Sequence, residues 1–242
     1  MAVLKKKNNS MSRTQHLFFA ATIIILILVL LRNNEPSPMT VPLPAEGNQP
    51  VLIIHNSSTA VLLLHGLTAT PWELSSLVSA FDERNMTVYA PLLVGHGLTP
   101  EDLERTSAEA LEADALRAYD TLTGYASHVF IVGISTGGDL GLVIAAQRNV
   151  SGVVTIGAPV VLADKNAPYA SFARYVLRYT PHPVGVGEED HYYTKYPVST
   201  VVELYRLVDR TIAALPSVRA PVLVLQAADD KTVNPVSAQT IF

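Results

Sequence analysis

The sequence predicts an α/β fold in which a mostly parallel sheet is covered by helices on both faces. From about residue 58 onward, apolar runs of strand length alternate with amphipathic runs of helical length. The strand-length runs, such as AVLLLHG and HVFIVGI, are apolar throughout, which is typical of strands buried on both faces of a sheet. A chain of 242 residues is long enough for one such domain with a large core.

Residues 1–31 are predicted to form an N-terminal signal anchor that crosses a membrane. Three lysines, Lys5 to Lys7, precede the uncharged run Leu17–Leu31, which covers about 22 Å as a helix and just spans a bilayer when it is extended back to Thr14. The basic flank places the rest of the chain outside the cytoplasm, in the periplasm or at the cell surface. A cleaved signal peptide and secretion are the alternative, but the following RNNEPSPMTVP lacks a small-x-small cleavage site.

Residues 32–50 contain five prolines and are predicted to be an extended linker. The domain that follows, 51–242, takes its strands from the apolar runs at 60–66, 86–93, 127–134, 151–159 and 220–227. Its helices are expected at 70–85, about 99–125, 135–147, 199–215 (with Ser199 or Thr200 as N-cap), and from 236 onward. A segment rich in Tyr, Pro and Gly at about 160–197 is too long for a plain loop and is predicted to be a functional insertion, a cap.

The composition excludes several classes of function. A net charge of −4 offers no basic surface for nucleic acid. The chain has no cysteine, which excludes a thiolate nucleophile, disulfides and cysteine-bound zinc. His182 and His191 lie near the acidic residues 188–190, but the cluster has no defined ligand spacing, so a solvated turn is expected rather than a metal site.

Ser135 is the candidate nucleophile. It lies in Gly133-Ile134-Ser135-Thr136-Gly137, between an apolar strand and a helix, which fits G-x-S-x-G at a sharp strand-to-helix turn. Glycines flank the serine because side chains there would collide with neighbouring elements. An earlier strand ends in His65-Gly66, and the N–H groups of Leu67 and Thr136 are predicted to form an oxyanion hole.

Four segments together resemble the α/β-hydrolase superfamily, and within it the small bacterial carboxylesterases and monoacylglycerol lipases. These segments are VLLLHGLTATPWEL, YAPLLVGHG, GISTGG and PVLVLQAADDKTVNP, and the resemblance covers about residues 58–242. It implies an α/β-hydrolase fold with a cap, a serine nucleophile, and no cofactor. It also implies that Asp230 is the catalytic acid, with Asp229 as the alternative and Asp164 a weaker candidate.

The resemblance further implies the chain order serine, acid, histidine, but no histidine follows Asp230. His65 and His96 are expected to shape loops, His16 adjoins the apolar run, and His55 and His128 adjoin strands. The cap histidines His182 and His191 are the remaining substitutes for a general base. The sequence is therefore expected to be a fragment that lacks the catalytic histidine and the last helix and strand of the fold.

The expected activity is hydrolysis of a short or medium acyl ester through an acyl-serine intermediate. The cap residues Tyr169, Phe172, Tyr175, Val176 and Leu177 either line the acyl pocket or pack the cap on the core. An acyltransferase or thioesterase with the same site is one alternative. A membrane-tethered binding module without catalysis is another.

Overall fold

The structure is a computed structural model of the chain, and it describes residues 47–162 and 170–242. The predicted signal anchor, residues 1–31, lies outside these ranges. Within them, no helix is both long and apolar enough to cross a membrane.

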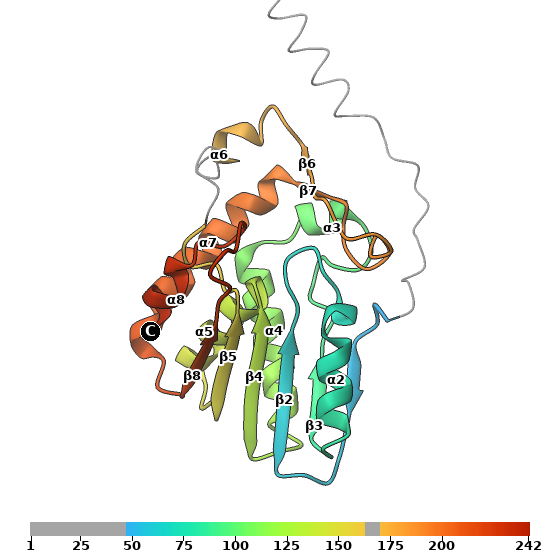
Figure 1. Cartoon of the computed structure of the whole chain (residues 1–242), viewed down its shortest axis with the longest axis vertical. Helices are drawn as coiled ribbons and strands as arrows, with labels where there is room; N and C mark the ends of the chain where they lie inside the picture. The colour runs from blue at the N-terminus through green and yellow to red at the C-terminus, as the bar shows by residue number, and fades with distance from the viewer. Residues whose placement is uncertain (1–46, 163–169) are drawn as a thin grey trace, which may run out of the picture.

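A six-stranded sheet with the order β1-β3-β2-β4-β5-β8 forms the centre of the molecule (Figure 1). All neighbouring strands are parallel except β1, which pairs antiparallel with β3 at one edge. The strands are β1 (Val51–Ile53), β2 (Thr59–Leu64), β3 (Thr87–Ala90), β4 (His128–Ile134), β5 (Gly152–Ile156) and β8 (Val222–Leu225). The mostly parallel sheet predicted from the apolar runs is confirmed.

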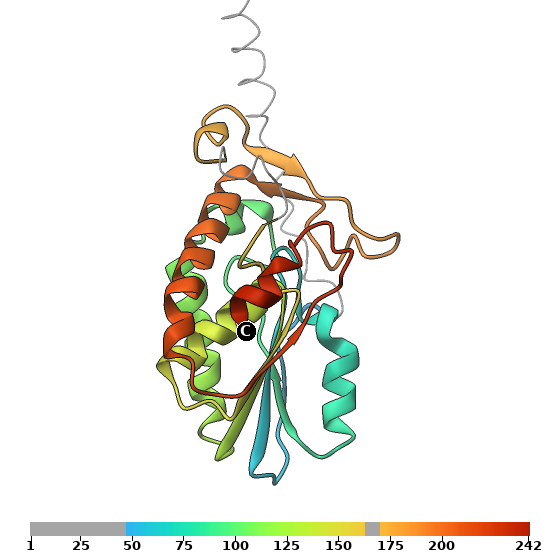
Figure 2. The ribbon, with the colours of Figure 1, turned by 60° about the vertical axis from the view of Figure 1, so that its left-hand side comes forward.

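Helices lie on both faces of the sheet, as expected (Figure 2). On one face, the 3-10 turn η1 (Pro71–Leu74) leads into α2 (Ser75–Asp82), which packs on Val61, Leu63 and neighbouring apolar residues. On the other face, α4 (Ala108–Leu122), α5 (Thr136–Gln147) and α7 (Val198–Ala214) bury the opposite side of the same strands. The alternation of strand side chains thus gives the molecule two apolar layers.

The helix predicted over about 99–125 is wrong in its length, because two capped helices replace it. Thr99 caps the short helix α3 (Pro100–Glu104), where its hydroxyl and the Asp102 carboxylate form a reciprocal capping box. Ser107 then starts α4, since its Oγ accepts the N–H of Ala110. Two N-caps within nine positions end one helix and begin another.

The described part of the cap contains the short helix α6 (Ala170–Ala173) and the antiparallel pair β6 (Tyr179–Pro181) and β7 (Lys195–Pro197). The prediction of Ser199 or Thr200 as an N-cap is wrong, because β7 runs directly into α7 and Pro197 takes the cap position. Both hydroxyls are instead buried within α7. The predicted start of a last helix is confirmed as α8 (Val236–Ile241), which follows Asn234 and Pro235.

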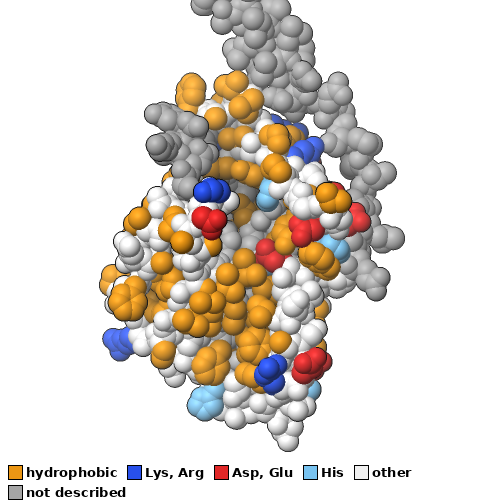
Figure 3. Space-filling model, viewed as in Figure 1, with side chains coloured by type: hydrophobic (Ala, Val, Ile, Leu, Met, Phe, Trp, Pro, Cys, Tyr) orange, Lys and Arg blue, Asp and Glu red, His pale blue; other side chains and the backbone are white. Residues whose placement is uncertain are grey.

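One face of the β4-β5-β8 side of the sheet is apolar and open. The cross-strand register places Val154 beside Leu223 and Ile156 beside Leu225, so these side chains share a face. Leu223 is 56% exposed and Leu225 is 45% exposed. Figure 3 shows the hydrophobic side chains gathered over these strands. Within the described ranges, α2 packs against β2 and β3, and the apolar layer under it extends to the buried Val132 of β4.

Candidate active site

Ser135 lies at a strained turn between β4 and α5. Its backbone has φ 50° and ψ −121°, a conformation that costs a residue other than glycine on the order of 1–3 kcal/mol. Its N–H donates to the carbonyl oxygen of Ile156 at 2.8 Å, which fixes the turn against the end of β5. The serine side chain is thereby raised at the carboxyl edge of the sheet, as the motif predicts.

The glycines around Ser135 are required by close approach of backbone atoms. A Cβ built on Gly133 would lie 2.2 Å from the Gly137 carbonyl oxygen, and one on Gly137 would lie 2.1 Å from the Leu64 carbonyl oxygen. The turn can therefore form only if both positions lack a side chain.

Ser135 opens into a cavity of about 490 Å³ between the sheet and the cap. Figure 3 shows the surface hollowed between these two parts of the molecule. The walls are mostly apolar, with Leu162, Val201, Leu204 and Val233 among them. A largely apolar cavity with few polar groups is typical of a site that binds an acyl chain or a similar small molecule.

Two backbone N–H groups at this cavity fit an oxyanion hole. Leu67 and Thr136 line the cavity together with Ser135. Among the described residues, neither the Leu67 N–H nor the Thr136 N–H donates a hydrogen bond to protein. Thr136 is also the first residue of α5, where the helix dipole favours negative charge. The structure thus brings both predicted donors to the same cavity as Ser135.

Asp230 follows β8 at the same edge of the sheet and is held by three hydrogen bonds. Its Oδ1 accepts the N–H groups of Thr232 and Val233, at 2.9 and 3.0 Å, and its Oδ2 accepts the Gln226 amide at 3.0 Å. Burial alone would raise the pKa of Asp230, but these hydrogen bonds outweigh burial and leave the pKa below its ordinary value. A carboxylate held ionised in this way is suited to orient an imidazole.

The alternative acids fit less well. Asp229 is exposed, and Asp164 lies outside the described residues. A Cβ built on Gly157, which follows β5, would lie 3.7 Å from Asp230 Oδ2, so Asp230 faces the strand that Ser135 N–H also contacts.

His65 and His96 fasten loops rather than face Ser135. His65 is fully buried, with Nδ1 donating to the Gly66 carbonyl and Nε2 accepting the N–H of Leu93. Burial, and next the neighbouring His96, lowers the pKa of His65 to about 3. Burial also lowers the pKa of His96 to about 4. Both rings are neutral at pH 7, in line with the loop role predicted for them.

Of the other histidines that the structure describes, His182 alone lies at the cavity of Ser135. Its Nδ1 is 3.1 Å from Thr68 Oγ1, and burial lowers its pKa. Within the described ranges no hydrogen bond joins it, or any histidine, to Ser135 Oγ. His55 pairs with Asp82, and His128 is exposed at the start of β4. His16 lies outside the described residues.

Phe172, Tyr175 and Leu177 were expected either to line the acyl pocket or to pack the cap on the core, but all three side chains are exposed and none lines the cavity. Other cap residues line the cavity instead, among them Tyr192 and Tyr196. Val176 is absent from the cavity lining, and Tyr169 lies outside the described residues. Sequence reasoning also missed Glu73, which lies in η1 and lines the cavity. The only sequence signal for its place at the cavity is that it follows shortly after the His-Gly turn.

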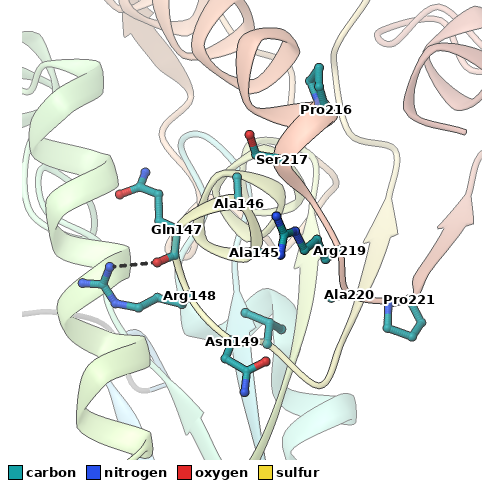
Figure 4. A pocket seen from close by; sticks show the side chains of 11 residues that line it. Ala145, Ala146, Gln147, Arg148, Asn149, Pro216, Ser217, Arg219, Ala220 and Pro221 are labelled. Carbon is teal, nitrogen blue, oxygen red and sulfur yellow. Dashed lines mark hydrogen bonds between the residues drawn. The ribbon is translucent and has the colours of Figure 1, made fainter.

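A larger hollow of about 780 Å³ lies at the opposite end of α5 and is not part of this site (Figure 4). It lies between the end of α5 and the turn before β8, where Arg148 donates to the Gln147 carbonyl. Its lining includes none of the predicted site residues, whereas Ser135, Leu67 and Thr136 all line the cavity under the cap.

Comparison with known proteins agrees with this geometry. The profile of the alpha/beta hydrolase family matches residues 61–241. The chain is 31% identical over 191 residues to a thermostable monoacylglycerol lipase of Bacillus sp. (strain H-257), covering 77% of this chain and 76% of the relative. It is 30% identical over 189 residues to a carboxylesterase of Bacillus subtilis (strain 168), covering 76% of each.

Solved structures show the same fold. One, from work on the metagenome-derived lipolytic enzymes LipS and LipT, superposes with a TM-score of 0.75 at 26% identity, covering 81% of this chain and 82% of that one. The monoacylglycerol lipase of Paleococcus ferrophilus superposes with a TM-score of 0.65 at 18% identity, covering 80% and 82%. With the elbow serine, its flanking glycines and these matches taken together, the chain belongs to the alpha/beta hydrolase family.

Proposed function

We propose that the protein is a serine carboxylic-ester hydrolase of the carboxylesterase or monoacylglycerol lipase type. The observation that carries the proposal is Ser135 at a strained elbow, open to an apolar cavity. The N–H groups of Leu67 and Thr136 lie beside it and donate no hydrogen bond within the part of the chain that the structure describes. The two Bacillus relatives, named as a monoacylglycerol lipase and a carboxylesterase, support the same class of reaction.

The proposed reaction is a two-step acyl transfer. Ser135 Oγ attacks the ester carbonyl carbon while a general base takes its proton, and the Leu67 and Thr136 N–H groups stabilise the oxyanion. The ester C–O bond then breaks, and the base returns the proton to the departing alcohol. Water, deprotonated by the same base, attacks the acyl-serine and releases the carboxylic acid and the free serine.

We propose that the general base is a histidine whose ring Asp230 orients, as the order serine, acid, histidine of this fold implies. Among the described residues, His182 in the cap is the candidate for this base, since it lies at the same cavity as Ser135.

The substrate class follows from the cavity. Its mostly apolar walls and its volume of about 490 Å³ suit a short or medium acyl chain. Thioesters, and alcohols as acyl acceptors, use the same atoms of the site, so they are the alternatives to test beside esters. The membrane anchor predicted for residues 1–31 stays a prediction from sequence alone.

Replacement of Ser135 by Ala in the full-length protein tests the proposal. We expect turnover of p-nitrophenyl butyrate to fall by a factor of about 10⁴ or more, because the nucleophile is lost. Ser217→Ala, in the turn before β8 and away from the cavity, is the matched control and should keep wild-type turnover.

A second variant, His182→Ala, tests whether His182 is the general base. We expect it to lower kcat by as much as Ser135→Ala if His182 is the base, and by less than tenfold if another group takes the proton. Retained turnover in Ser135→Ala would contradict the assignment of the nucleophile. Binding of esters without turnover by the wild-type protein would instead favour a non-catalytic binding module.

A further inference from the structure

Glu73 is a largely buried carboxylate at the edge of the cavity, and the proposed acyl-transfer steps do not use it. Its Oε2 accepts the N–H of Gly66 at 2.7 Å, and its Oε1 accepts the hydroxyl of Tyr192 at 3.3 Å. A Cβ built on Gly66 would lie 3.5 Å from Glu73 Oε2 and 3.5 Å from Ser135 Cβ. Gly66 therefore lies between the carboxylate and the nucleophile.

The Gly66–Leu67 peptide carries one of the two proposed oxyanion donors, the N–H of Leu67. The carbonyl oxygen of this peptide accepts His65 Nδ1 at 2.9 Å and the N–H of Ala69 at 3.3 Å. Glu73 holds the N–H on the other side of Gly66. Because glycine is free to rotate about its backbone bonds, both sides must be held for the Leu67 N–H to point steadily into the cavity.

The cap contacts this loop at two adjacent residues. The hydroxyl of Tyr192 donates to Glu73, and the N–H of Tyr193 donates to the carbonyl of Thr68 at 3.0 Å. The preceding cap residue, His191, stacks on Trp72 with ring centroids 4.2 Å apart and an interplanar angle of 2°. The cap segment 191–193 is thus fixed to both ends of the loop that carries the oxyanion donor.

We propose that Glu73 is a positioning residue that aims the Leu67 N–H, and that Tyr192 couples the seating of the cap to it. This inference rests on the proposed function and names the residue that holds its oxyanion hole in place. It assigns Glu73 no contact with the reacting atoms.

The buried charge of Glu73 lowers the stability of the fold. Burial raises the pKa of Glu73, although the hydrogen bonds from Gly66 and Tyr192 oppose that effect. A carboxyl whose pKa is raised by folding loses stability as the pH rises through that pKa, so the ionised form destabilises the fold at neutral pH. Gln at this position keeps an acceptor for the Gly66 N–H and removes the buried charge.

The test compares Glu73→Ala with Glu73→Gln in the full-length protein. For Glu73→Ala, we expect kcat on p-nitrophenyl butyrate to fall about tenfold to a hundredfold with KM within twofold, because an oxyanion donor is loosened but not removed. Glu73→Gln should restore kcat to within about threefold of wild type and should melt at a temperature no lower than wild type at pH 7. Tyr192→Phe should give a smaller loss of kcat than Glu73→Ala.

Glu112→Ala is the matched control. Glu112 is also a buried carboxylate with two partners, Arg210 and Gln147, but it lies on α4, away from the cavity. It should lose stability without losing kcat. Hydrogen exchange of the segment 63–70 should become faster in Glu73→Ala and not in Glu112→Ala, and this readout does not depend on the base.

The outcomes separate the two proposals. Wild-type kcat in Glu73→Ala, beside an inactive Ser135→Ala, would overturn the role of Glu73 and leave the proposed function standing. Equal losses of kcat in Glu73→Ala and Glu112→Ala would show that instability alone explains the effect. An active Ser135→Ala would instead overturn the proposed function itself.

Discussion

Ser135 stores backbone strain that its neighbours hold in place. The residue adopts a positive φ that few side chains tolerate, and it does so between the strand β4 and the helix α5. The hydrogen bond from its N–H to Ile156 ties the strained turn to the next strand. The position of the nucleophile therefore depends on the fit of its neighbours as much as on the serine.

Gly137→Ala tests this dependence. The added Cβ would lie 2.1 Å from the Leu64 carbonyl oxygen, so α5 or the end of β2 must shift. We expect a loss of about 3 kcal/mol in the free energy of unfolding, at the upper end for overpacking, together with loss of esterase activity. Urea unfolding measures the first and p-nitrophenyl butyrate turnover the second.

Gly124→Ala is the control for that substitution, because its Cβ would meet only the Thr121 carbonyl oxygen at 3.4 Å. It should change stability by less than about 1 kcal/mol. If Gly137→Ala were as stable and as active as Gly124→Ala, the close packing of the elbow would not matter.

At the scale of single residues, the sequence predicted what a local motif specifies. Ser135, Leu67 and Thr136 each lie within a few positions of a glycine whose spacing is diagnostic, and the structure brings them to one cavity. Glu73 and Tyr192 were missed because their contact spans 119 positions and leaves no local pattern. Phe172 and Tyr175 were expected in the pocket or in the packing of the cap, but both are exposed. Composition alone does not tell which side chains of a cap face inward.

At the scale of elements, the loops that follow β2 and β3 pack together and support the site. The loop after β2 carries His65 and the loop after β3 carries His96, and their rings meet edge to face with centroids 4.9 Å apart. His65 Nε2 accepts the N–H of Leu93, which joins the two loops directly. Among the described residues, His96 Nε2 is buried without a partner.

His96 in the second of these loops should make the free energy of unfolding decrease in mild acid. Folding lowers the pKa of His96 to about 4, so the unfolded chain binds its proton first as the pH falls below about 6.5. Above that pH, the neutral His96 ring makes its full contribution to stability. As the pH falls from about 6.5 to the folded pKa, the free energy of unfolding decreases by up to about 1.4 kcal/mol per pH unit.

The comparison of wild type with His96→Asn isolates this effect. Asp139 is fully buried, and burial raises its pKa well above the ordinary value. Its contribution to stability therefore increases as the pH falls, opposite to that of His96, and the wild-type pH profile alone contains both contributions. We expect urea unfolding to show the wild type losing stability relative to His96→Asn between pH 7 and pH 5. A constant difference between wild type and His96→Asn would contradict the prediction.

Strands and helices were predicted well where burial alone decides them. The five apolar runs all became strands, because parallel strands are buried on both faces. The edge strand β1 went unrecognised, since it has only three residues and its middle residue, Leu52, is exposed. The break at residues 105–107 and the start of α7 were also missed, because local capping and the direct passage from β7 into α7 decide them.

At the scale of the molecule, the cover of the sheet is uneven. Helices α4, α5 and α7 bury one face along its length, whereas within the described ranges the β4-β5-β8 part of the other face is open (Figures 1 and 2). The open part is apolar and includes Phe130, Leu223 and Leu225, which are 39%, 56% and 45% exposed. Apolar patches of this kind favour contact with another apolar surface.

We therefore expect the protein to self-associate through this face. Leu223→Lys with Leu225→Lys should weaken association tenfold or more, because each half-exposed leucine contributes about 1 kcal/mol when it is buried. Sedimentation velocity at rising protein concentration measures the change. Leu52→Lys with Ile54→Lys, at the opposite edge of the sheet, adds the same charge and should leave association near wild type, since these side chains lie away from the open face. If both pairs weakened association equally, net charge rather than the apolar face would control it.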